Sequence, residues 1–367
     1  MAKLGEVCLI NPKSCTLRDD TEVSFIPMTK VGEHGEFDAS EIKNYSEVKK
    51  GFTNFQNGDI LFAKITPCME NGKGAIAHNM KNGIGFGSTE FHVLRPDTDK
   101  ITSEWLYYLT TWKAFRKEAE RNMTGSAGQK RVPKTFLENY VVNLPDIDTQ
   151  KSENKILRKV DDLIFLRKQQ LSKLDELVKA RFVEMFGDPV SNPMGWKRVR
   201  FDSISENLDS KRVPVTESDR KEGVYPYYGA SGIVDWINDY IFDEDILLVS
   251  EDGANLLMRS TPIAFSVSGK SWVNNHAHVV RFHDFATQKF IEVYFSLIDI
   301  SEYITGTAQP KLNQAKLNTM LFCWPPLSLQ KQFAAFVERV DQQKQTVQQS
   351  LDKLELMKKA LMQEYFG

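Results

Sequence analysis

Long cationic and amide side chains gather in and after glycine-rich stretches of this 367-residue chain, at 71–74, 124–129 and 305–310. Ammonium and guanidinium groups suit phosphate oxygens, and Asn, Gln, Arg and Lys side chains can hydrogen-bond base edges in a major groove. The densest basic cluster lies between residues 198 and 212. We predict that nucleic acid is contacted by Lys64, Asn71, Lys73, Lys130, Arg131, Lys134, Arg198, Arg200, Lys211, Arg212 and Lys311. For each Lys or Arg among them, a solvated surface charge is the alternative.

Two motifs approach catalytic signatures without completing them. Residues 269–271, Gly-Lys-Ser, match the end of a phosphate-binding loop, but Ala264 stands where that motif has its first glycine. Asp146, Glu153 and Lys155 mimic a metal-dependent nuclease signature. The chain contains a second copy of this segment, described below, and its matching columns hold no charged side chain. Solvation at the start of a helix explains the two carboxylates better.

A pair of histidines could suggest a metal site. His276 and His278 are two residues apart, but the matching positions elsewhere in the chain are Glu90 and His92, so the pair is not repeated. Packed or hydrogen-bonded histidines are the simpler interpretation. The loops Asn-Pro-Pro-Tyr and Asp-Pro-Pro-Tyr, with which amino-methyltransferases hold a target base, do not occur. We therefore predict no catalytic residue, no metal site and no cofactor in this chain.

Overall charge does not indicate a nucleic-acid partner. The chain has 47 basic and 49 acidic side chains and a formal net charge of -2, so any basic surface must be local. Its four cysteines form no CxxC pair, which favours a reducing compartment. The first residues lack an apolar signal stretch, and no apolar run approaches the roughly 18 residues of a membrane span. We expect a cytoplasmic protein with no membrane partner.

The elements that must position these residues occur twice. Residues 129–187 align without a gap onto 309–367, and the identical columns include Gln150/Gln330 and Phe186/Phe366. A second alignment, at an offset of 186, places 59–61 (Asp-Ile-Leu) on 245–247 and His92 on His278. The chain therefore reads as a globular segment followed by a helix, repeated once.

Each copy ends in one long predicted helix. Neither glycine nor proline occurs in 148–186 or in 328–366, and Asp148 and Ser328 are candidate N-caps. Apolar residues in both segments follow the 4-3 spacing of a helix-helix seam. The predicted seam consists of Val160, Ile164, Leu171, Leu174 and Val178 in the first helix and Val340, Val347, Leu351, Leu354 and Leu361 in the second.

The two helices are predicted to pair with each other in an antiparallel arrangement. Charged residues interrupt each seam twice but never in the same column: Arg167 and Arg181 in the first helix, Lys344 and Lys358 in the second. Complementary interruptions favour pairing of the two helices with each other over pairing of identical helices from two chains. Such a pair would hold the two globular segments a fixed distance apart. The alternative is that each helix packs on its own globular segment.

The globular segments combine strands with helices, which indicates an α+β class. Residues 59–63, 91–94, 245–249 and 278–281 are rich in β-branched and aromatic side chains and are predicted strands, while 104–121 and 289–303 are predicted helices. We predict globular domains at 1–147 and 188–327, separated by the helices 148–187 and 328–367. These helices would form a long antiparallel coiled coil with pseudo-two-fold symmetry.

With this organisation, the chain resembles the specificity (S) subunits of type I restriction-modification systems. Segment 58–67 (GDILFAKITP) leading to 70–73 (ENGK) is similar to the family's first-domain loop, and 225–232 (YPYYGASG) is similar to its second-domain counterpart. Further matching segments, in order, are 185–189 before Trp196-Lys197, 306–313 and 325–330. The resemblance covers essentially the whole chain.

The resemblance implies two target-recognition domains, each reading one half of a split, asymmetric sequence in double-stranded DNA, with the paired helices acting as a ruler. It also implies partners: methyltransferase (M) subunits, two in number, that bring S-adenosylmethionine, and restriction (R) subunits that bring ATP. The chain itself would then be a non-catalytic specificity subunit in DNA methylation and restriction.

Two other functions stay open at the level of sequence. A coiled-coil scaffold with two protein-binding heads would have basic loops of ordinary surface character. A nuclease or methyltransferase would need the motifs that are missing. One structural question also stays open: the first copy begins at 4–7, where the second has the longer lead 196–201, so the first domain could take an edge strand from elsewhere.

Overall fold

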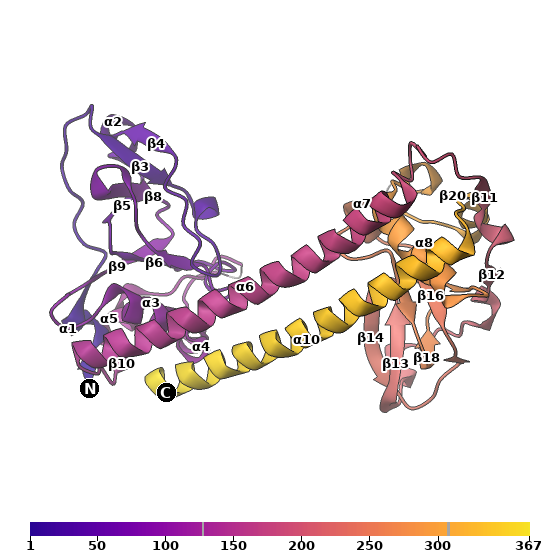
Figure 1. The fold of residues 1–367 in the computed structure, drawn as a ribbon. Helices are drawn as coiled ribbons and strands as arrows, with labels where there is room; N and C mark the ends of the chain where they lie inside the picture. Colours follow the sequence, from indigo (N-terminus) through magenta and orange to yellow (C-terminus); the bar gives the residue numbers. More distant parts are fainter. Residues whose placement is uncertain (127, 307–308) are drawn as a thin grey trace. The chain divides into compact units, whose positions relative to one another are not determined.

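The chain forms two compact units in a computed structural model that describes residues 1–126, 128–306 and 309–367. Ala127, Thr307 and Ala308, which belong to two of the glycine-rich stretches, lie outside the described residues. Unit 1 comprises Met1–Leu166 and Leu351–Gly367, and unit 2 comprises Arg167–Ser350. Each unit therefore combines one globular part with portions of both long helices, and the α+β class is confirmed (Figure 1).

Unit 1 contains three sheets. Its strands are β1 (Ala2–Lys3), β2 (Cys8–Ile10), β3 (Glu22–Ile26), β4 (Ile42–Asn44), β5 (Thr53–Gln56), β6 (Ile60–Ala63), β7 (Gly74–Ile76), β8 (Ile84–Gly87), β9 (Phe91–Pro96) and β10 (Val141–Val142). An antiparallel sheet has the order β2-β9-β6-β7, and a mixed sheet has the order β4-β3-β8-β5 with β3 and β8 parallel. The short strands β1 and β10 pair with each other, so the first copy supplies its own edge.

Unit 2 repeats these sheets in the same topology. Its strands are β11 (Arg198–Arg200), β12 (Glu206–Asn207), β13 (Glu222–Gly229), β14 (Gly232–Ile237), β15 (Phe242–Asp243), β16 (Ile246–Ser250), β17 (Ala264–Val267), β18 (Lys270–Val273), β19 (Ala277–Arg281) and β20 (Leu321–Cys323). The orders are β12-β19-β16-β17, β14-β13-β18-β15 with β13 and β18 parallel, and β11-β20. All four predicted strands are thus confirmed, as β6, β9, β16 and β19.

Strand pairing corrects the second sequence alignment by one residue. His92 of β9 lies opposite Phe62, whereas its counterpart His278 of β19 lies opposite Val249. The offset of 186 holds for the histidines but is wrong for β6 and β16, because β16 is displaced by one residue. Side chains alternate between the two faces of a strand, so a slip of one residue would exchange core and surface. The position that follows β6, Lys64, consequently corresponds to Glu251.

Short helices cover the sheets. Unit 1 has α1 (Leu4–Val7), α2 (Tyr45–Val48), α3 (Ser103–Thr111), α4 (Lys113–Arg121), α5 (Lys134–Asn139), η1 (Met28–Lys30) and η2 (Lys81–Gly83). Unit 2 has α7 (Asn255–Met258), α8 (Phe285–Leu297), α9 (Gln314–Thr319), η3 (Phe201–Ser203), η4 (Asp209–Lys211), η5 (Glu217–Asp219) and η6 (Ser301–Tyr303). The predicted helix 104–121 is interrupted at Trp112, whose backbone is extended (φ -61°, ψ 128°). The predicted helix 289–303 ends as α8 at Leu297.

The long helices α6 (Ile147–Phe186) and α10 (Leu327–Phe366) are 40 residues each and run antiparallel within each unit. In unit 1, Lys358 Nζ lies 2.6 Å from Asp161 Oδ1. In unit 2, Arg167 Nε donates to Ser350 Oγ at 3.1 Å and Lys344 Nζ lies 2.5 Å from Asp175 Oδ1. Three of the four cations that interrupt the seams therefore bond to the opposite helix.

The apolar seam positions lie at the contact between the helices or on the globular parts. Buried members are Val160, Ile164, Val178, Val340, Val347 and Leu351, and half-buried members are Leu171, Leu174, Leu354 and Leu361. Within the described residues, every helix falls short of the combined length and apolarity that a membrane crossing requires.

The identical columns of the two copies have matching structural tasks. Gln150 and Gln330 are fully buried, and each donates its amide to the carbonyl of a proline five residues earlier, at 2.9 Å. Phe186, near the end of α6, packs on Phe290 and Phe333 in unit 2, with ring centroids 4.9 and 5.4 Å away. Phe366, near the end of α10, packs on Trp105 in unit 1 at 4.8 Å. The end of each long helix is thus anchored in a core.

Candidate nucleic-acid interface

The structure brings most of the predicted first-domain residues together on two adjoining loops. The chain leaves β6 at Lys64 and returns in β7, and the second loop follows α4. The Thr66 amide donates to the Lys130 carbonyl at 3.1 Å, and the Val132 amide donates to the Lys64 carbonyl at 2.9 Å. Gly72, with φ +95°, makes the turn that returns the first loop to the sheet, a conformation that suits glycine.

These residues differ in how accessible their polar side-chain groups are to a ligand. Lys64 is half-buried, while Asn71 and Lys130 are exposed. The side chains of these three make no ion pair or hydrogen bond within the described residues. Lys73 is partly used inside the domain, because its Nζ donates to the Met28 carbonyl at 3.3 Å. Lys64, Asn71 and Lys130 are therefore the available groups of this surface.

Two further predicted cations are paired with carboxylates. Arg131 donates from Nε and Nη2 to both oxygens of Glu90, at 2.8 Å each. That bidentate hydrogen bond holds the pKa of Glu90 below its usual range, against the opposing effect of burial. Lys134, at the start of α5, lies 2.9 Å from Glu138. A phosphate would have to compete with these carboxylates.

A buried arginine that the sequence analysis missed supports the first loop from beneath. Arg116 of α4 donates from Nη1 to the Met69 carbonyl at 2.6 Å, and its guanidinium lies over the Phe62 ring, 5.1 Å from the centroid. Burial lowers the pKa of Arg116 to about 10. The sequence did not predict the burial of Arg116, because it lies in segment 113–121 among other charged residues, which are exposed.

The equivalent loops of unit 2 carry different chemistry on the same backbone. The amide of Glu251 donates to the His276 carbonyl, and the Leu312 amide donates to the Glu251 carbonyl, both at 2.8 Å. Lys64 makes the matching pair of backbone bonds in unit 1, to Glu90 and Val132. A carboxylate thus replaces an ammonium at the same position. Lys311 lies 3.0 Å from Glu251, so it too is paired.

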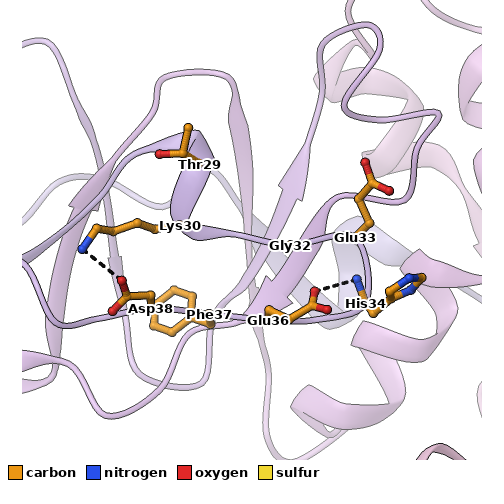
Figure 2. Close-up of a pocket in the computed structure, with 8 residues that line it drawn as sticks. All are labelled: Thr29, Lys30, Gly32, Glu33, His34, Glu36, Phe37 and Asp38. Carbon is orange, nitrogen blue, oxygen red and sulfur yellow. Dashed lines mark hydrogen bonds and ion pairs between the residues drawn. The ribbon is translucent and has the colours of Figure 1, made fainter. Parts of the chain in front are cut away.

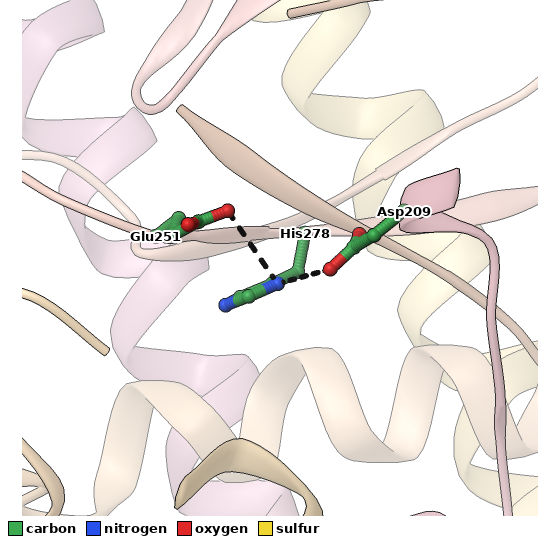
Figure 3. A group of neighbouring side chains, drawn as sticks. All are labelled: Asp209, Glu251 and His278. Carbon is green, nitrogen blue, oxygen red and sulfur yellow. Dashed lines mark hydrogen bonds and ion pairs between the residues drawn. The ribbon is translucent and has the colours of Figure 1, made fainter. Parts of the chain in front are cut away.

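Behind these loops, unit 2 contains a charge network around the buried His278 (Figure 3). His278 Nδ1 lies 2.6 Å from Asp209 and 3.7 Å from Glu251, and its Nε2 lies 2.7 Å from the Leu312 carbonyl. Arg212, only 13% exposed, lies 2.7 Å from Glu251 and 3.3 Å from Asp209. Burial alone would raise the pKa values of both carboxylates, but the hydrogen bond with His278 holds the pKa of Asp209 below its usual range, and the bonds from Arg212 and Lys311 do the same for Glu251.

The same three side chains could in principle bind a metal ion, since their ligand atoms lie within 4.8 Å of one another. Two cations, Arg212 and Lys311, already neutralise the carboxylates. The donor set therefore fits a closed ion-pair network better than a divalent site. The sequence analysis saw His276 and His278 alone, because Asp209 and Glu251 come from distant segments.

The basic cluster predicted at 198–212 is divided by the fold. Arg198 and Arg200 lie on β11, whereas Lys211 lies in η4 beside β12 and β19. Arg200 forms a bidentate pair with Asp202, and Arg198 donates to the Val190 carbonyl at 2.8 Å. Arg212, predicted to contact nucleic acid, has its guanidinium inside the network described above, where it pairs with Glu251 and Asp209. Lys211 is exposed.

The motifs that approached catalytic signatures have structural roles. Asp146 accepts a hydrogen bond from the Thr149 amide at 2.8 Å, the bond of a helix cap. Glu153 accepts from Trp105 Nε1 at 2.8 Å. Lys270 lies in β18 with its ammonium 4.6 Å from the centroid of the Tyr240 ring, so segment 269–271 leads into a strand and not a helix.

A hollow of about 550 Å³ in the segment that follows β3 is lined by several charged groups, and some of these are paired (Figure 2). Lys30 Nζ lies 3.1 Å from Asp38, and Glu36 accepts from the His34 amide at 2.9 Å. Its lining residues belong to a single short segment, 29–38. A second hollow, of about 480 Å³, adjoins the candidate loops of unit 1 and is lined by Thr66, Glu70, Lys117, Glu120, Arg121, Met123, Gly128 and Lys130.

Comparison with known proteins identifies relatives of this chain. It is 46% identical over 178 residues to the specificity subunit of the type I restriction enzyme EcoAI and 41% identical over 179 residues to that of EcoEI, both from Escherichia coli. Each alignment covers 47% of this chain but only 30% and 29% of the relative, so the chain spans about a third of the length of these relatives.

Solved structures share the fold over nearly the full length. The S subunit of a type I restriction-modification system from M. genitalium superposes with a TM-score of 0.57 at 13% identity, covering 100% of this chain and 95% of that one. A chain from a structure described as the basis of complex assembly and conformational transition of the type I R-M system has a TM-score of 0.56 at 17% identity, covering 99% and 96%. The family described as "Type I restriction modification DNA specificity domain" matches residues 1–176 and 193–356. The chain, with its two copies of one α+β unit and its paired helices, therefore belongs to the type I restriction-modification DNA specificity family.

Proposed function

We propose that this chain is the non-catalytic DNA specificity subunit of a type I restriction-modification complex. Each unit reads one half of a split, asymmetric sequence in double-stranded DNA, and the paired helices α6 and α10 set the spacing of the halves. Methyltransferase subunits, two in number, dock on the chain and bring S-adenosylmethionine. Restriction subunits bring ATP. The chain itself contributes recognition and assembly.

The observation that carries this proposal is the pair of equivalent loops with different side chains. At the position after the central strand, unit 1 presents Lys64 and unit 2 presents Glu251, held by the same two backbone hydrogen bonds. Beside them, Arg131 corresponds to Lys311. Two domains with the same fold but different polar side chains suit two different half-sites. Proteins distinguish base edges by the hydrogen-bond donors and acceptors that they place against them.

Methylation of a mixed DNA pool tests the proposal directly. The chain is copurified with its methyltransferase partner, the complex is incubated with S-adenosylmethionine and a library of duplexes of randomised sequence, and the methylated positions are sequenced. We expect one bipartite, asymmetric motif with an unspecified spacer. Methylation without sequence preference would contradict the proposal.

A second measurement separates this function from a protein-binding scaffold. Specific DNA binding by the complex should weaken steeply with salt, because each phosphate contact releases counterions. A scaffold with two protein-binding heads would instead bind its partners equally well with and without competitor DNA. Turnover by the pure chain with metal or S-adenosylmethionine alone would indicate an enzyme in its own right.

A further inference from the structure

Helix α4 of unit 1 presents a row of cations to solvent. Lys113, Lys117 and Arg121 are spaced four residues apart, which places them on one helical face, and all three are exposed. The opposite face is buried and includes Phe115 and Arg116. The helix is therefore fixed on its apolar side, and its exposed side carries the row of three cations together with Glu118 and Glu120.

The three cations are not neutralised within the protein. Their side chains make no ion pair or hydrogen bond with any residue of the described ranges, unlike Arg131 or Lys311. Like charges at four-residue spacing repel one another and destabilise a helix slightly. Such an arrangement becomes favourable when an external anion lies along the row.

This face continues into the loops already assigned to DNA. Lys117 and Arg121 line the same hollow of about 480 Å³ as Thr66 and Lys130, and its other charged lining residues are Glu70 and Glu120. On the other side of α4, Arg116 binds the loop backbone at Met69. The helix and the loop thus form one continuous surface, in which the loop offers polar groups and the helix offers charge.

Unit 2 has no equivalent row. The segment that precedes the Thr305/Lys311 bridge, 295–303, corresponds in position to α4, which precedes the Thr124/Arg131 bridge. It contains no Lys or Arg, and it carries Asp299 and Glu302 instead. The basic face is therefore a property of the first reader alone.

We propose that the exposed face of α4 contacts the phosphate backbone of DNA beside the half-site that unit 1 reads. The inference rests on the proposed function and extends it to a surface outside the reading loops. The row from Lys113 to Arg121 spans about 12 Å at 1.5 Å per residue. Duplex DNA carries one charge per roughly 1.7 Å of its axis, so several phosphates fall within that length. Phosphate contacts of this kind add affinity without sequence preference.

The test measures how DNA binding depends on salt. The triple variant Lys113→Gln, Lys117→Gln, Arg121→Gln is compared with the wild-type chain in complex with the methyltransferase partner, using a fluorescent duplex of random sequence. The control variant Lys13→Gln, Arg18→Gln, Lys50→Gln removes the same charge from three exposed positions of unit 1 whose side chains likewise make no bond to the described residues. Thermal unfolding followed by circular dichroism checks that both variants fold.

We expect the slope of log K against log salt to fall in magnitude by about 0.9 for each phosphate that the variant no longer neutralises, hence by roughly 2 to 3 in the triple variant and far less in the control. The methylated motif should stay the same.

A slope equal to that of the control would overturn the inference. Relaxed sequence preference in the first half-site would also overturn it, because it would indicate base contact. Unchanged DNA binding together with weakened binding to poly-glutamate would overturn it as well, because it would indicate an acidic protein partner. Methylation without any motif by the wild-type complex would count against the proposed function, while the salt slope would still decide the role of α4.

Discussion

At the scale of single residues, two equivalent buried histidines have different hydrogen-bond partners in the two units. His92 and His278 each place Nε2 against a backbone carbonyl, of Val132 at 2.8 Å and of Leu312 at 2.7 Å. The Nδ1 atom of His92 faces the Asn11 side chain, and burial lowers the pKa of His92. The Nδ1 atom of His278 faces Asp209. Both ring nitrogens of His278 thus meet oxygen atoms, a carboxylate and a carbonyl, whereas His92 meets an amide side chain and a carbonyl.

Acid should therefore weaken unit 2 through its buried carboxylates. The pKa values of Asp209 and Glu251 lie below the ordinary 3.8 and 4.5, so their contribution is fully present above those ordinary values and is lost as pH falls through the lowered ones. We expect Asp209→Asn to lose about 1 to 3 kcal/mol of stability at neutral pH, because it removes the carboxylate that lies 2.6 Å from the buried His278, and to show a smaller further loss below about pH 4.

Urea unfolding at several pH values, followed by hydrogen exchange of unit 2 peptides, measures both effects. Asp239→Asn is the control, since Asp239 is exposed and lies outside the network. Equal acid sensitivity of Asp209→Asn and the wild type would show that this network does not govern the acid response.

Arg116 should matter for the shape of the first reading loop more than for its charge. Arg116→Met keeps much of the packing on Phe62 but leaves the Met69 carbonyl without its donor, so we expect a loss of about 1 to 3 kcal/mol and faster hydrogen exchange in 64–73. Lys117→Met, one residue further on the exposed face, should change stability by less than about 0.5 kcal/mol. Equal hydrogen-exchange rates of 64–73 in the two variants would show that Arg116 does not position this loop.

At the scale of elements, the long helices are specified by polar as well as apolar contacts. Lys358 pairs with Asp161 in unit 1, and Lys344 pairs with Asp175 in unit 2. Exposed pairs of this kind add little stability, yet a wrong register would set these cations against apolar positions. The charged interruptions therefore help to select the antiparallel partner that the apolar seam stabilises.

The aromatic end of α6 should be a sensitive point of unit 2. Phe186 is 3% exposed and packs among Phe182, Phe290 and Phe333, so Phe186→Ala leaves a cavity that we expect to cost about 3 to 5 kcal/mol. Phe186→Leu should cost much less, and Val183→Ala, at a position 42% exposed, should be close to neutral. The measurement is urea unfolding with hydrogen exchange resolved by unit. Equal destabilisation of both units by Phe186→Ala would mean that the residue does not act locally.

At the scale of the whole molecule, the sequence was sufficient for the repeat and the long helices but insufficient for the strand register and the burial of individual cations. The repeat, the long helices and four strands followed from identity, from the lack of helix breakers and from β-branched runs. The one-residue displacement of β16 did not, because Asp-Ile-Leu occurs in both copies in a misleading register. The burial of Arg116 and Arg212 did not follow from the sequence either. It depends on contacts with segments distant in the chain, those of Met69 and Glu251.

The last prediction concerns whether the two units act independently in the proposed function. The Lys64 side chain has no bonded partner within the described residues and belongs to unit 1, so on the proposed function Lys64→Ala should weaken methylation only through one half-site. If Lys64 contacts a base, we expect a loss of about 1 to 3 kcal/mol and relaxed preference at one position of that half. The measurement is the methylation rate on duplexes substituted singly in either half, with Lys316→Ala, an exposed residue of α9 in unit 2, as the control. A uniform loss on all duplexes would assign Lys64 to a phosphate, and relaxed preference in both halves would show that the two units do not read separately.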